Sequence, residues 1–344
     1  MSEPVALKLT AKDFKSDQEV RWCPGCGDYA ILAAVQQFMP QLKIPRENTV
    51  FISGIGCSSR FPYYMNTYGM HSIHGRAPAI ATGLSVSRPD LSVWVVTGDG
   101  DALSIGGNHL IHALRRNVNL KILLFNNKIY GLTKGQYSPT SEVGKITKST
   151  PAGSADAPFN PISLALGAEA SFVGRTIDSD RKHLQSVLRA AAEHQGSAFV
   201  EIYQNCNIFN DGAFDQLKEP DTRDDYLIRL EHGQPITFGK DGRFCVVHPP
   251  GGFGLEVRET ASTPAEQIVV HDATVTDPAY AFALSRLPGA DLRNTPIGVF
   301  RSVDRPSYDS VVQAQLAEAK AKVTETPEQQ LAGLLASGDT WTIL

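Results

Sequence analysis

Short, continuously apolar runs alternate with helix-compatible segments along the first two thirds of the chain. Residues 93–96 (Val-Trp-Val-Val) and 122–125 (Ile-Leu-Leu-Phe) are typical of parallel strands that are buried on both faces of a sheet. Further strands are expected at residues 49–52, 170–173 and 198–203, and helices at residues 29–38, 79–86, 162–168 and 181–194. Because strands and helices alternate, the sequence predicts an α/β fold with a doubly wound, mainly parallel sheet.

The pattern changes twice along the chain and so predicts three parts. Residues 1–20 are expected to form a loosely structured arm, and residues 21–215 carry the alternation of strands and helices. In residues 216–344 prolines and glycines concentrate, which predicts a C-terminal extension whose last two helices span residues 310–323 and 327–336. A chain of 344 residues exceeds the length at which a single core usually stops growing, so one large domain with an appendage is expected.

Composition and charge exclude several classes of protein. The chain has 32 basic and 36 acidic residues and a net charge of −4, and no block of Lys and Arg indicates nucleic-acid binding. No apolar run approaches the roughly 20 residues of a membrane-spanning helix, and the N-terminus has no apolar signal core. Five cysteines are few and odd in number, unlike a secreted disulfide framework. We therefore expect a cytoplasmic protein that binds neither membranes nor nucleic acid.

A carboxylate and an amide stand directly after the two most apolar strands. Asp99 follows residues 93–96 in a Gly-Asp-Gly turn, and Asn127 follows residues 122–125. Open α/β sheets bind their ligands at the carboxyl ends of parallel strands. Both side chains are hard oxygen donors, which suit Mg²⁺ that is held together with substrate phosphates. Gly100 would let the backbone approach a diphosphate, and the alternative is a tight turn without a ligand.

Four of the five cysteines lie in distinctive surroundings. Cys23 and Cys26 form Cys-Pro-Gly-Cys-Gly, Cys57 lies in Gly-Ile-Gly-Cys-Ser-Ser, and Cys206 lies in Gln-Asn-Cys-Asn. A Cys-x-x-Cys pair is half of many metal sites, and its spacing leaves zinc and iron–sulfur both open. Cys245 lies within an apolar run and is expected to be a small buried residue.

Five motifs together carry a resemblance to a known family. The Gly-Asp-Gly turn, then 25 residues, then the pair Asn126-Asn127 resemble the diphosphate and magnesium motif of thiamine diphosphate enzymes. Four further motifs occur around this one, Cys-Pro-Gly-Cys-Gly at 23–27, Gly-Ile-Gly-Cys-Ser-Ser at 54–59, His-Gly-Arg at 74–76 and Tyr-Gly-Leu-Thr-Lys-Gly-Gln at 130–136. In this order they closely resemble the β subunit of 2-oxoacid:ferredoxin oxidoreductases over roughly residues 20–215.

The resemblance implies two metal-containing groups. One is a [4Fe–4S] cluster, which needs four thiolates and would be held by Cys23, Cys26, Cys57 and Cys206. Cys206 has the least distinctive flanking sequence, and the alternative for it is a buried structural thiol. The other group is the Mg²⁺ of thiamine diphosphate, which the side chains of Asp99 and Asn127 and the backbone carbonyl of Ile129 would bind.

The resemblance also assigns the residues that would surround thiamine diphosphate. They come from four of the motifs and are Ile55, Gly56, Cys57, Ser58, His74, Gly100, Asp101, Gly131 and Leu132. His74 would contact the cofactor, although an isolated histidine is more often structural. The turn around Cys57 would place the cluster against the thiamine. The polar, Gly- and Pro-rich residues 137–161 are expected to form a functional loop.

Two basic residues are candidates for substrate binding. Arg60 should point into the same cavity as Cys57, and carboxylates prefer the planar fork of arginine. In the family a basic residue stands at this position in members that accept 2-oxoglutarate, where it can meet the distal carboxylate. Lys134 matches a lysine associated with coenzyme A or substrate. For each residue the alternative is a surface charge.

The resemblance implies the β subunit of a 2-oxoglutarate:ferredoxin oxidoreductase. Such an enzyme decarboxylates 2-oxoglutarate oxidatively, forms succinyl-CoA with CoA as co-substrate, and passes electrons through [4Fe–4S] to ferredoxin. Because the pattern contains one such α/β unit, a separate α subunit is expected to supply the pyrimidine-binding domain and the catalytic carboxylate, in an α2β2 assembly. The alternatives are the same enzyme for pyruvate or a branched 2-oxoacid, and a non-catalytic metal-binding scaffold.

Overall fold

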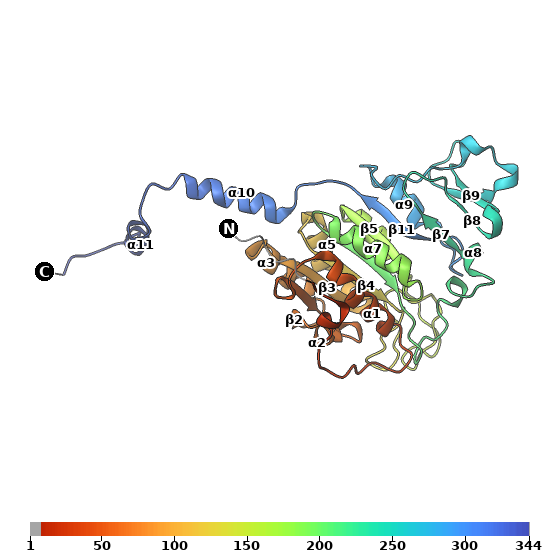
Figure 1. Ribbon diagram of the computed structural model, residues 1–344, viewed down its shortest axis with the longest axis horizontal. Coiled ribbons are helices and arrows are strands. Elements are labelled where there is room, and N and C mark those ends of the chain that lie inside the picture. The colour runs from red at the N-terminus through yellow and green to blue at the C-terminus, as the bar shows by residue number, and fades with distance from the viewer. Residues whose placement is uncertain (1–7, 344) are drawn as a thin grey trace.

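A mostly parallel sheet forms the centre of the molecule (Figure 1). The computed structural model describes residues 8–343, so residues 1–7 of the predicted N-terminal arm lie outside the described chain. Within this range eight strands form one sheet, in the order β2 (Tyr68–His71), β1 (Thr49–Ser53), β3 (Ser92–Gly98), β4 (Lys121–Asn126), β6 (Ala198–Tyr203), β5 (Phe172–Ile177), β11 (Thr295–Ser302) and β7 (Leu227–Leu230). Neighbouring strands run parallel, apart from β11, which is antiparallel to β5. This confirms the predicted fold class.

Helices cover both faces of this sheet (Figure 1). The helices of the described chain are α1 (Asp28–Phe38), α2 (Phe61–Tyr64), α3 (Ala77–Ser87), α4 (Asp99–Leu103), α5 (Gly107–Arg116), α6 (Pro161–Gly167), α7 (Arg181–Glu193), α8 (Arg223–Tyr226), α9 (Ala279–Ser285), α10 (Tyr308–Ala321) and α11 (Pro327–Leu335). α1 and α7 pack on one face, and α3, α5 and α6 pack on the other. Along β3, Val93 and Val95 enter one core while Trp94 and Val96 enter the other, which is why this run is apolar throughout.

The ends of several helices follow from local hydrogen bonding. The Asn160 side chain accepts a hydrogen bond from Ser163 N at 3.1 Å, and Pro161 begins α6 at a position that needs no N–H partner. The Asp180 side chain caps α7 in the same way. α5 ends at Arg116, because the next residue, Asn117, takes a left-handed φ of 55°.

β5 differs from the sequence prediction of a strand at residues 170–173. The strand spans Phe172–Ile177, although Gly174 and Arg175 interrupt the apolar pattern. Arg175 is buried, and its Nε donates to Oε2 of Glu201 on neighbouring β6 at 2.6 Å. A buried charge is tolerated when it is paired and hydrogen-bonded, and this pairing is not visible in the pattern of one strand.

Residues after position 215 contribute both to the main sheet and to a smaller one. β7 and β11 hydrogen-bond within the main sheet, and β8 (Thr237–Phe238), β9 (Phe244–Val247) and β10 (Glu256–Glu259) form an antiparallel sheet in which Cys245 is buried, as expected. α10 and α11 form an arm that extends away from the body of the molecule (Figure 1). None of the helices in residues 8–343 has the length and apolar character needed to cross a membrane. The domain boundary at residue 215 stays a prediction.

Two shielded histidines should make the stability of this fold depend on pH. His194 Nε2 lies 2.6 Å from Ser171 Oγ, and His183 Nδ1 lies 2.8 Å from Thr176 Oγ1. Burial lowers the pKa of each imidazole to about 4, from an ordinary value of 6.5. Between these two pH values the unfolded chain binds more protons than the folded chain. Stability is therefore complete above the unfolded pKa and falls as the pH falls through this window.

We expect each of these histidines to remove about 2 kcal/mol from the free energy of unfolding between pH 7 and pH 4.5. Urea unfolding at the two pH values measures this loss. His194→Gln should make the loss smaller, and His112→Gln, at an exposed position of α5, controls for the removal of a histidine. The same loss in wild type and in His194→Gln would contradict the assignment.

Candidate functional site

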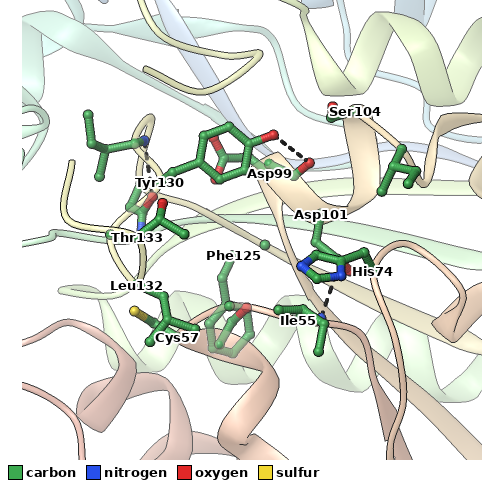
Figure 2. Close-up of a pocket in the computed structure, with 18 residues that line it drawn as sticks. Ile55, Cys57, His74, Asp99, Asp101, Ser104, Phe125, Tyr130, Leu132 and Thr133 are labelled. Atoms are coloured by element: carbon green, nitrogen blue, oxygen red, sulfur yellow. Dashed lines mark hydrogen bonds between the residues drawn. The ribbon is translucent and has the colours of Figure 1, made fainter. Parts of the chain in front are cut away.

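The carboxyl ends of β1, β3 and β4 meet around a cavity of about 290 Å³, which we call the first cavity (Figure 2). The turn after β1, the start of α4, the segment after β4 and the loop before α3 line it. Twelve residues that the sequence predicts for thiamine diphosphate or Mg²⁺ come together here, Ile55, Gly56, Cys57, Ser58, His74, Asp99, Gly100, Asp101, Asn127, Ile129, Gly131 and Leu132. Their individual roles stay predictions.

Asp99 is the first residue of α4 and is buried against the first cavity. Its Oδ2 atom accepts hydrogen bonds from Ser138 Oγ at 2.5 Å and from Thr140 Oγ1 at 2.6 Å. Burial raises the pKa of this carboxyl to about 6, although the two hydroxyls act in the opposite direction. A desolvated carboxylate is stabilised when a cation binds beside it. The surroundings of Asp99 therefore suit a metal ligand.

The segment after β4 turns so that Asn127 and Ile129 border the same cavity. Asn127 Oδ1 accepts a hydrogen bond from Ile129 N at 3.2 Å, and Asn127 Nδ2 donates to Gln204 Oε1 at 2.9 Å. Lys128 between them has a left-handed φ of 55°. Together with Asp99, an amide oxygen and a backbone carbonyl would form an all-oxygen donor set of the kind that Mg²⁺ prefers.

Asp101 connects two of the loops that line the first cavity to the end of β3. Its Oδ1 accepts hydrogen bonds from Ile55 N at 3.2 Å and Gly75 N at 2.7 Å, and its Oδ2 accepts one from Thr97 Oγ1 at 2.8 Å. Gly75 has a φ of 66°, a conformation that favours glycine. This carboxylate therefore holds the turn after β1 and the turn at His74 against the end of β3. Figure 2 shows Asp101 between His74 and Ile55.

Gly100 is a position where a side chain does not fit. A Cβ atom there would lie 2.1 Å from Cε1 of Tyr130, whose hydroxyl donates to Gly100 O at 3.1 Å. In the sequence, Tyr130 stood out only as part of the motif at 130–136, and Ser138 and Thr140 only as part of the loop at 137–161. The polar composition of residues 137–161 marked this loop but not the contacts of Ser138 and Thr140.

A second cavity, of about 220 Å³, brings together the four cysteines Cys23, Cys26, Cys57 and Cys206. Cys57 and Gly131 line both cavities, and a Cβ atom on Gly131 would lie 3.6 Å from Sγ of Cys57 and of Cys206. Burial raises the pKa of the Cys57 thiol to about 12 and also raises the pKa of Cys26. In the described part of the chain, no group of three or more His, Cys, Asp or Glu side chains is arranged to hold a single metal ion. The four cysteines therefore line one cavity beside the first.

Arg60 and Lys134 line the second cavity but not the first. A third cavity, of about 530 Å³, shares Ile55 and Leu132 with the first and is lined by Arg60 and His71. His71 was not among the residues predicted from the sequence. Arg60 Nη1 donates to a backbone carbonyl, that of Arg21, at 3.0 Å. Lys134 lines the second cavity together with Arg60. The Arg60 guanidinium thus lies in a cavity that shares part of its wall with the first cavity.

Comparison with known proteins agrees with this geometry. A family described as thiamine pyrophosphate enzyme, C-terminal TPP binding domain, matches residues 54–202. The 2-oxoglutarate oxidoreductase subunit KorB of Mycobacterium tuberculosis is 65% identical over 332 residues, which are 96% of this chain and 88% of that protein. The 2-oxoglutarate synthase subunit KorB of Archaeoglobus fulgidus is 39% identical over 224 residues, which are 63% of this chain and 82% of that protein.

A solved structure is similar over nearly the whole chain. It is a 2-oxoglutarate:ferredoxin oxidoreductase from Magnetococcus marinus with 2-oxoglutarate, coenzyme A and succinyl-CoA bound. The two chains superimpose with a TM-score of 0.74 at 34% identity, and the match covers 95% of this chain and 96% of the other. The predicted resemblance is thereby confirmed, and the chain belongs to the family of 2-oxoacid:ferredoxin oxidoreductase β subunits.

Proposed function

We propose that the chain is the β subunit of a 2-oxoglutarate:ferredoxin oxidoreductase, which converts 2-oxoglutarate and CoA to succinyl-CoA and CO₂ and reduces ferredoxin. Two relatives have 2-oxoglutarate in their names, and the similar solved structure contains 2-oxoglutarate, coenzyme A and succinyl-CoA. The observation that carries the proposal is the shared wall of Cys57, Gly131 and Leu132 between the first cavity and the four-cysteine cavity. Groups bound in the two cavities would be close enough for electrons to pass between them.

The first cavity fits thiamine diphosphate with Mg²⁺. Asp99 and Asn127 would bind the metal through their side chains and Ile129 through its carbonyl, a donor set that matches the preference of Mg²⁺ for oxygen. When bound, thiamine diphosphate supplies the nucleophilic carbon and the electron sink that decarboxylation requires. The protein positions this cofactor, because Asp101 holds the surrounding loops together and His74 borders the cavity.

The second cavity fits a [4Fe–4S] cluster. Cys23, Cys26, Cys57 and Cys206 all line this one cavity. Four thiolates that line one cavity match the ligand set of an iron–sulfur cluster. When bound, such a cluster supplies a one-electron carrier between the first cavity and ferredoxin. The similarity to oxidoreductases favours this cluster over the zinc-binding scaffold that the cysteine spacing left open.

We assign the third cavity to the distal end of the 2-oxoacid. Arg60 lines it, and a guanidinium pairs well with a second carboxylate such as that of 2-oxoglutarate. Its hydrogen bond to Arg21 O holds one edge of the guanidinium and restricts its orientation. We assign Lys134, which lines the neighbouring cavity, to the anionic groups of coenzyme A.

Replacing Arg60 with isoleucine should weaken the preference for 2-oxoglutarate. We expect kcat/KM for 2-oxoglutarate to fall about tenfold to a hundredfold, because a charge-assisted pair is lost, while pyruvate is little affected. Steady-state rates of the assembled enzyme on a panel of 2-oxoacids measure this, with Arg115→Ile, at an exposed position of α5, as the control. An unchanged preference would remove Arg60 from the proposal, and a wild-type preference for pyruvate or a branched 2-oxoacid would favour the alternative substrates.

We propose that an α subunit covers the mouths of the three cavities. Large apolar side chains border them and are between 37% and 58% exposed, namely Tyr63, Ile105, Leu132 and Phe209. Exposed apolar side chains that cluster around a site are typical of a protein interface. The α subunit would supply the pyrimidine-binding domain and the catalytic carboxylate, in an α2β2 assembly.

Anaerobic co-expression with the α subunit tests the proposed function. The purified complex should contain iron, sulfide, magnesium and thiamine diphosphate, and it should reduce ferredoxin only when both 2-oxoglutarate and CoA are present. The β chain purified alone is the control and should not turn over substrate. A complex that contains zinc without iron, sulfide or thiamine would instead favour a non-catalytic scaffold.

A further inference from the structure

We propose that three buried hydroxyl residues, Ser138, Thr140 and Ser141, act as positioning residues for the Mg²⁺ ligands of the first cavity. We call these three residues the hydroxyl clamp. The inference rests on the proposed function, since it assumes that the first cavity binds Mg²⁺ and thiamine diphosphate. It adds residues that belong to none of the five sequence motifs.

The hydroxyl clamp contacts Asp99 on one side of the cavity. Ser138 Oγ and Thr140 Oγ1 both lie within hydrogen-bond distance of Asp99 Oδ2, at 2.5 Å and 2.6 Å. Neither hydroxyl contacts Oδ1. Asp99, Ser138 and Thr140 are all buried, so water does not compete for these hydrogen bonds. The two bonds therefore fix the rotation of the Asp99 carboxylate. Oδ1 is thereby left for a metal ion.

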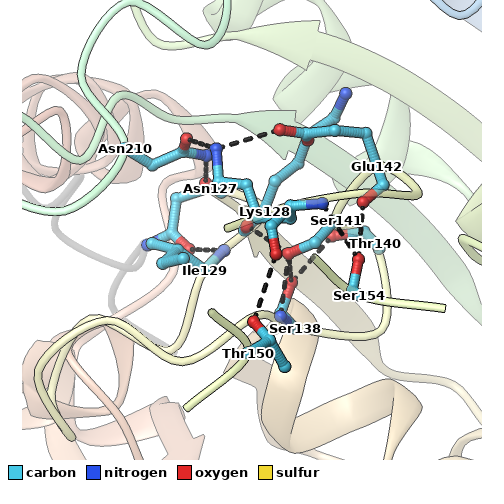
Figure 3. A network of polar contacts seen from close by, with 11 residues as sticks. Asn127, Lys128, Ile129, Ser138, Thr140, Ser141, Glu142, Thr150, Ser154 and Asn210 are labelled. Carbon is cyan, nitrogen blue, oxygen red and sulfur yellow. Dashed lines mark hydrogen bonds and ion pairs between the residues drawn. The ribbon is translucent and has the colours of Figure 1, made fainter. Parts of the chain in front are cut away.

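On the other side of the cavity, Thr140 and Ser141 contact the end of β4 and the turn that follows it (Figure 3). Thr140 Oγ1 lies 2.9 Å from Asn126 Oδ1, and Ser141 Oγ donates to Lys128 O at 2.6 Å. Lys128 N donates back to Asn126 Oδ1 at 3.1 Å. These bonds define the turn that carries Asn127 and Ile129. The hydroxyl clamp therefore connects Asp99 to the segment that provides the other two proposed metal ligands.

A buried ion pair fixes the orientation of Asn126 within this network. Asn126 Nδ2 donates to Glu201 Oε1 at 2.7 Å, and Arg175 Nε donates to Glu201 Oε2 at 2.6 Å. A carboxylate accepts hydrogen bonds and cannot donate them, so it selects the Nδ2 end of the amide. The Oδ1 end of Asn126 then points to Thr140 and Lys128 N.

Thr140 has a single hydroxyl proton and two acceptors within reach, Asp99 Oδ2 and Asn126 Oδ1. The carboxylate is the stronger acceptor, and Asn126 Oδ1 keeps the hydrogen bond from Lys128 N in either case. Thr140 Oγ1 thus lies within hydrogen-bond distance of both halves of the site, and its one proton bonds to one of them at a time. Removing that atom should separate the halves without changing the ligands themselves.

Thiamine diphosphate binding as a function of Mg²⁺ tests this inference. In the anaerobically purified α–β complex, stripped of cofactor by dialysis against chelator, fluorescence titration gives the apparent Kd for thiamine diphosphate at each Mg²⁺ concentration. Thr140→Val should raise the Mg²⁺ requirement about tenfold, the effect usual for residues that orient metal ligands. Thr140→Ser keeps the hydroxyl and should behave nearly as wild type. Ser138→Ala should show a smaller shift in the same direction.

A matched control comes from the same loop. Among residues 8–343, the Thr147 hydroxyl hydrogen-bonds only with Ser149 and Thr150, so Thr147→Val should leave the Mg²⁺ requirement unchanged. Iron content and melting temperature should also stay at wild-type values in Thr140→Val and Ser138→Ala. The inference is overturned if both variants need no more Mg²⁺ than wild type, or if binding, iron and melting temperature decline together. If the wild-type complex binds no thiamine diphosphate, the proposed function itself fails.

Discussion

Asp99→Asn should leave the assembled enzyme almost without thiamine diphosphate and without activity. The substitution keeps the size of the side chain but removes the negative charge that would face Mg²⁺ in the first cavity. Loss of residues that only orient a metal ligand already lowers metal affinity or activity by about 10- to 100-fold. We therefore expect the loss of the ligand itself to lower kcat/KM for 2-oxoglutarate by at least about a hundredfold. Cofactor analysis of the purified complex and rates of ferredoxin reduction measure the two effects.

Asp309→Asn is the matched control for this prediction. Asp309 is also a buried aspartate, but it accepts a hydrogen bond from Asn119 N at 2.8 Å and belongs to none of the three cavities. This variant should retain both cofactor and activity. An Asp99→Asn enzyme with a full complement of thiamine diphosphate and Mg²⁺ would show that the diphosphate is anchored elsewhere.

Cys26→Ser should remove the iron–sulfur cluster and reduce ferredoxin-dependent activity to background. Cys26 lines the four-cysteine cavity but not the first cavity, so its replacement affects the iron–sulfur cluster more directly than thiamine diphosphate. We therefore expect Mg²⁺-dependent binding of thiamine diphosphate to persist while the visible absorbance and the iron content fall. Iron and sulfide analysis, the absorption spectrum and a thiamine diphosphate titration distinguish the two outcomes.

Cys245→Ser controls for the loss of a buried thiol. Cys245 is fully buried in β9, in the smaller sheet, and is not among the cysteines of the second cavity. Its replacement should lower stability without changing iron content. Full iron and normal ferredoxin reduction in Cys26→Ser would exclude this cysteine as a cluster ligand and reopen the assignment of the second cavity.

The placement of Asp99 and Asn127 was predictable because it depends on short stretches of chain. β3 and β4 are apolar on both faces, they are consecutive parallel strands, and consecutive strands are usually neighbours in a sheet. Residues that follow such strands therefore meet at one edge. Cys206 is different, since it lies beside Cys57 only because β6 pairs with β4, and the sequence indicated its role through family resemblance alone.

Other contacts could not be predicted from any local pattern. Arg175 appears in the sequence as a charge that ends a strand, and only Glu201 across the β5–β6 pair makes its burial favourable. Residues 127–160 contain neither helix nor strand in the structure, so no periodicity indicated which hydroxyls of this loop face Asp99. The addition of β7 and β11 to the main sheet likewise depends on pairing between residues that are distant in sequence.

By itself the sequence determined the α/β architecture, the edge of the sheet that carries the site, and the family, because apolar periodicity and short glycine- and cysteine-containing motifs are local properties. Only the tertiary structure decided that the four cysteines surround one cavity beside the first, and that Ser138, Thr140 and Ser141 join Asp99 to the turn after β4. The physical reason is that a hydrogen bond depends on distance and direction in space. Chains of such bonds between distant loops form only after the core has placed the strand ends together.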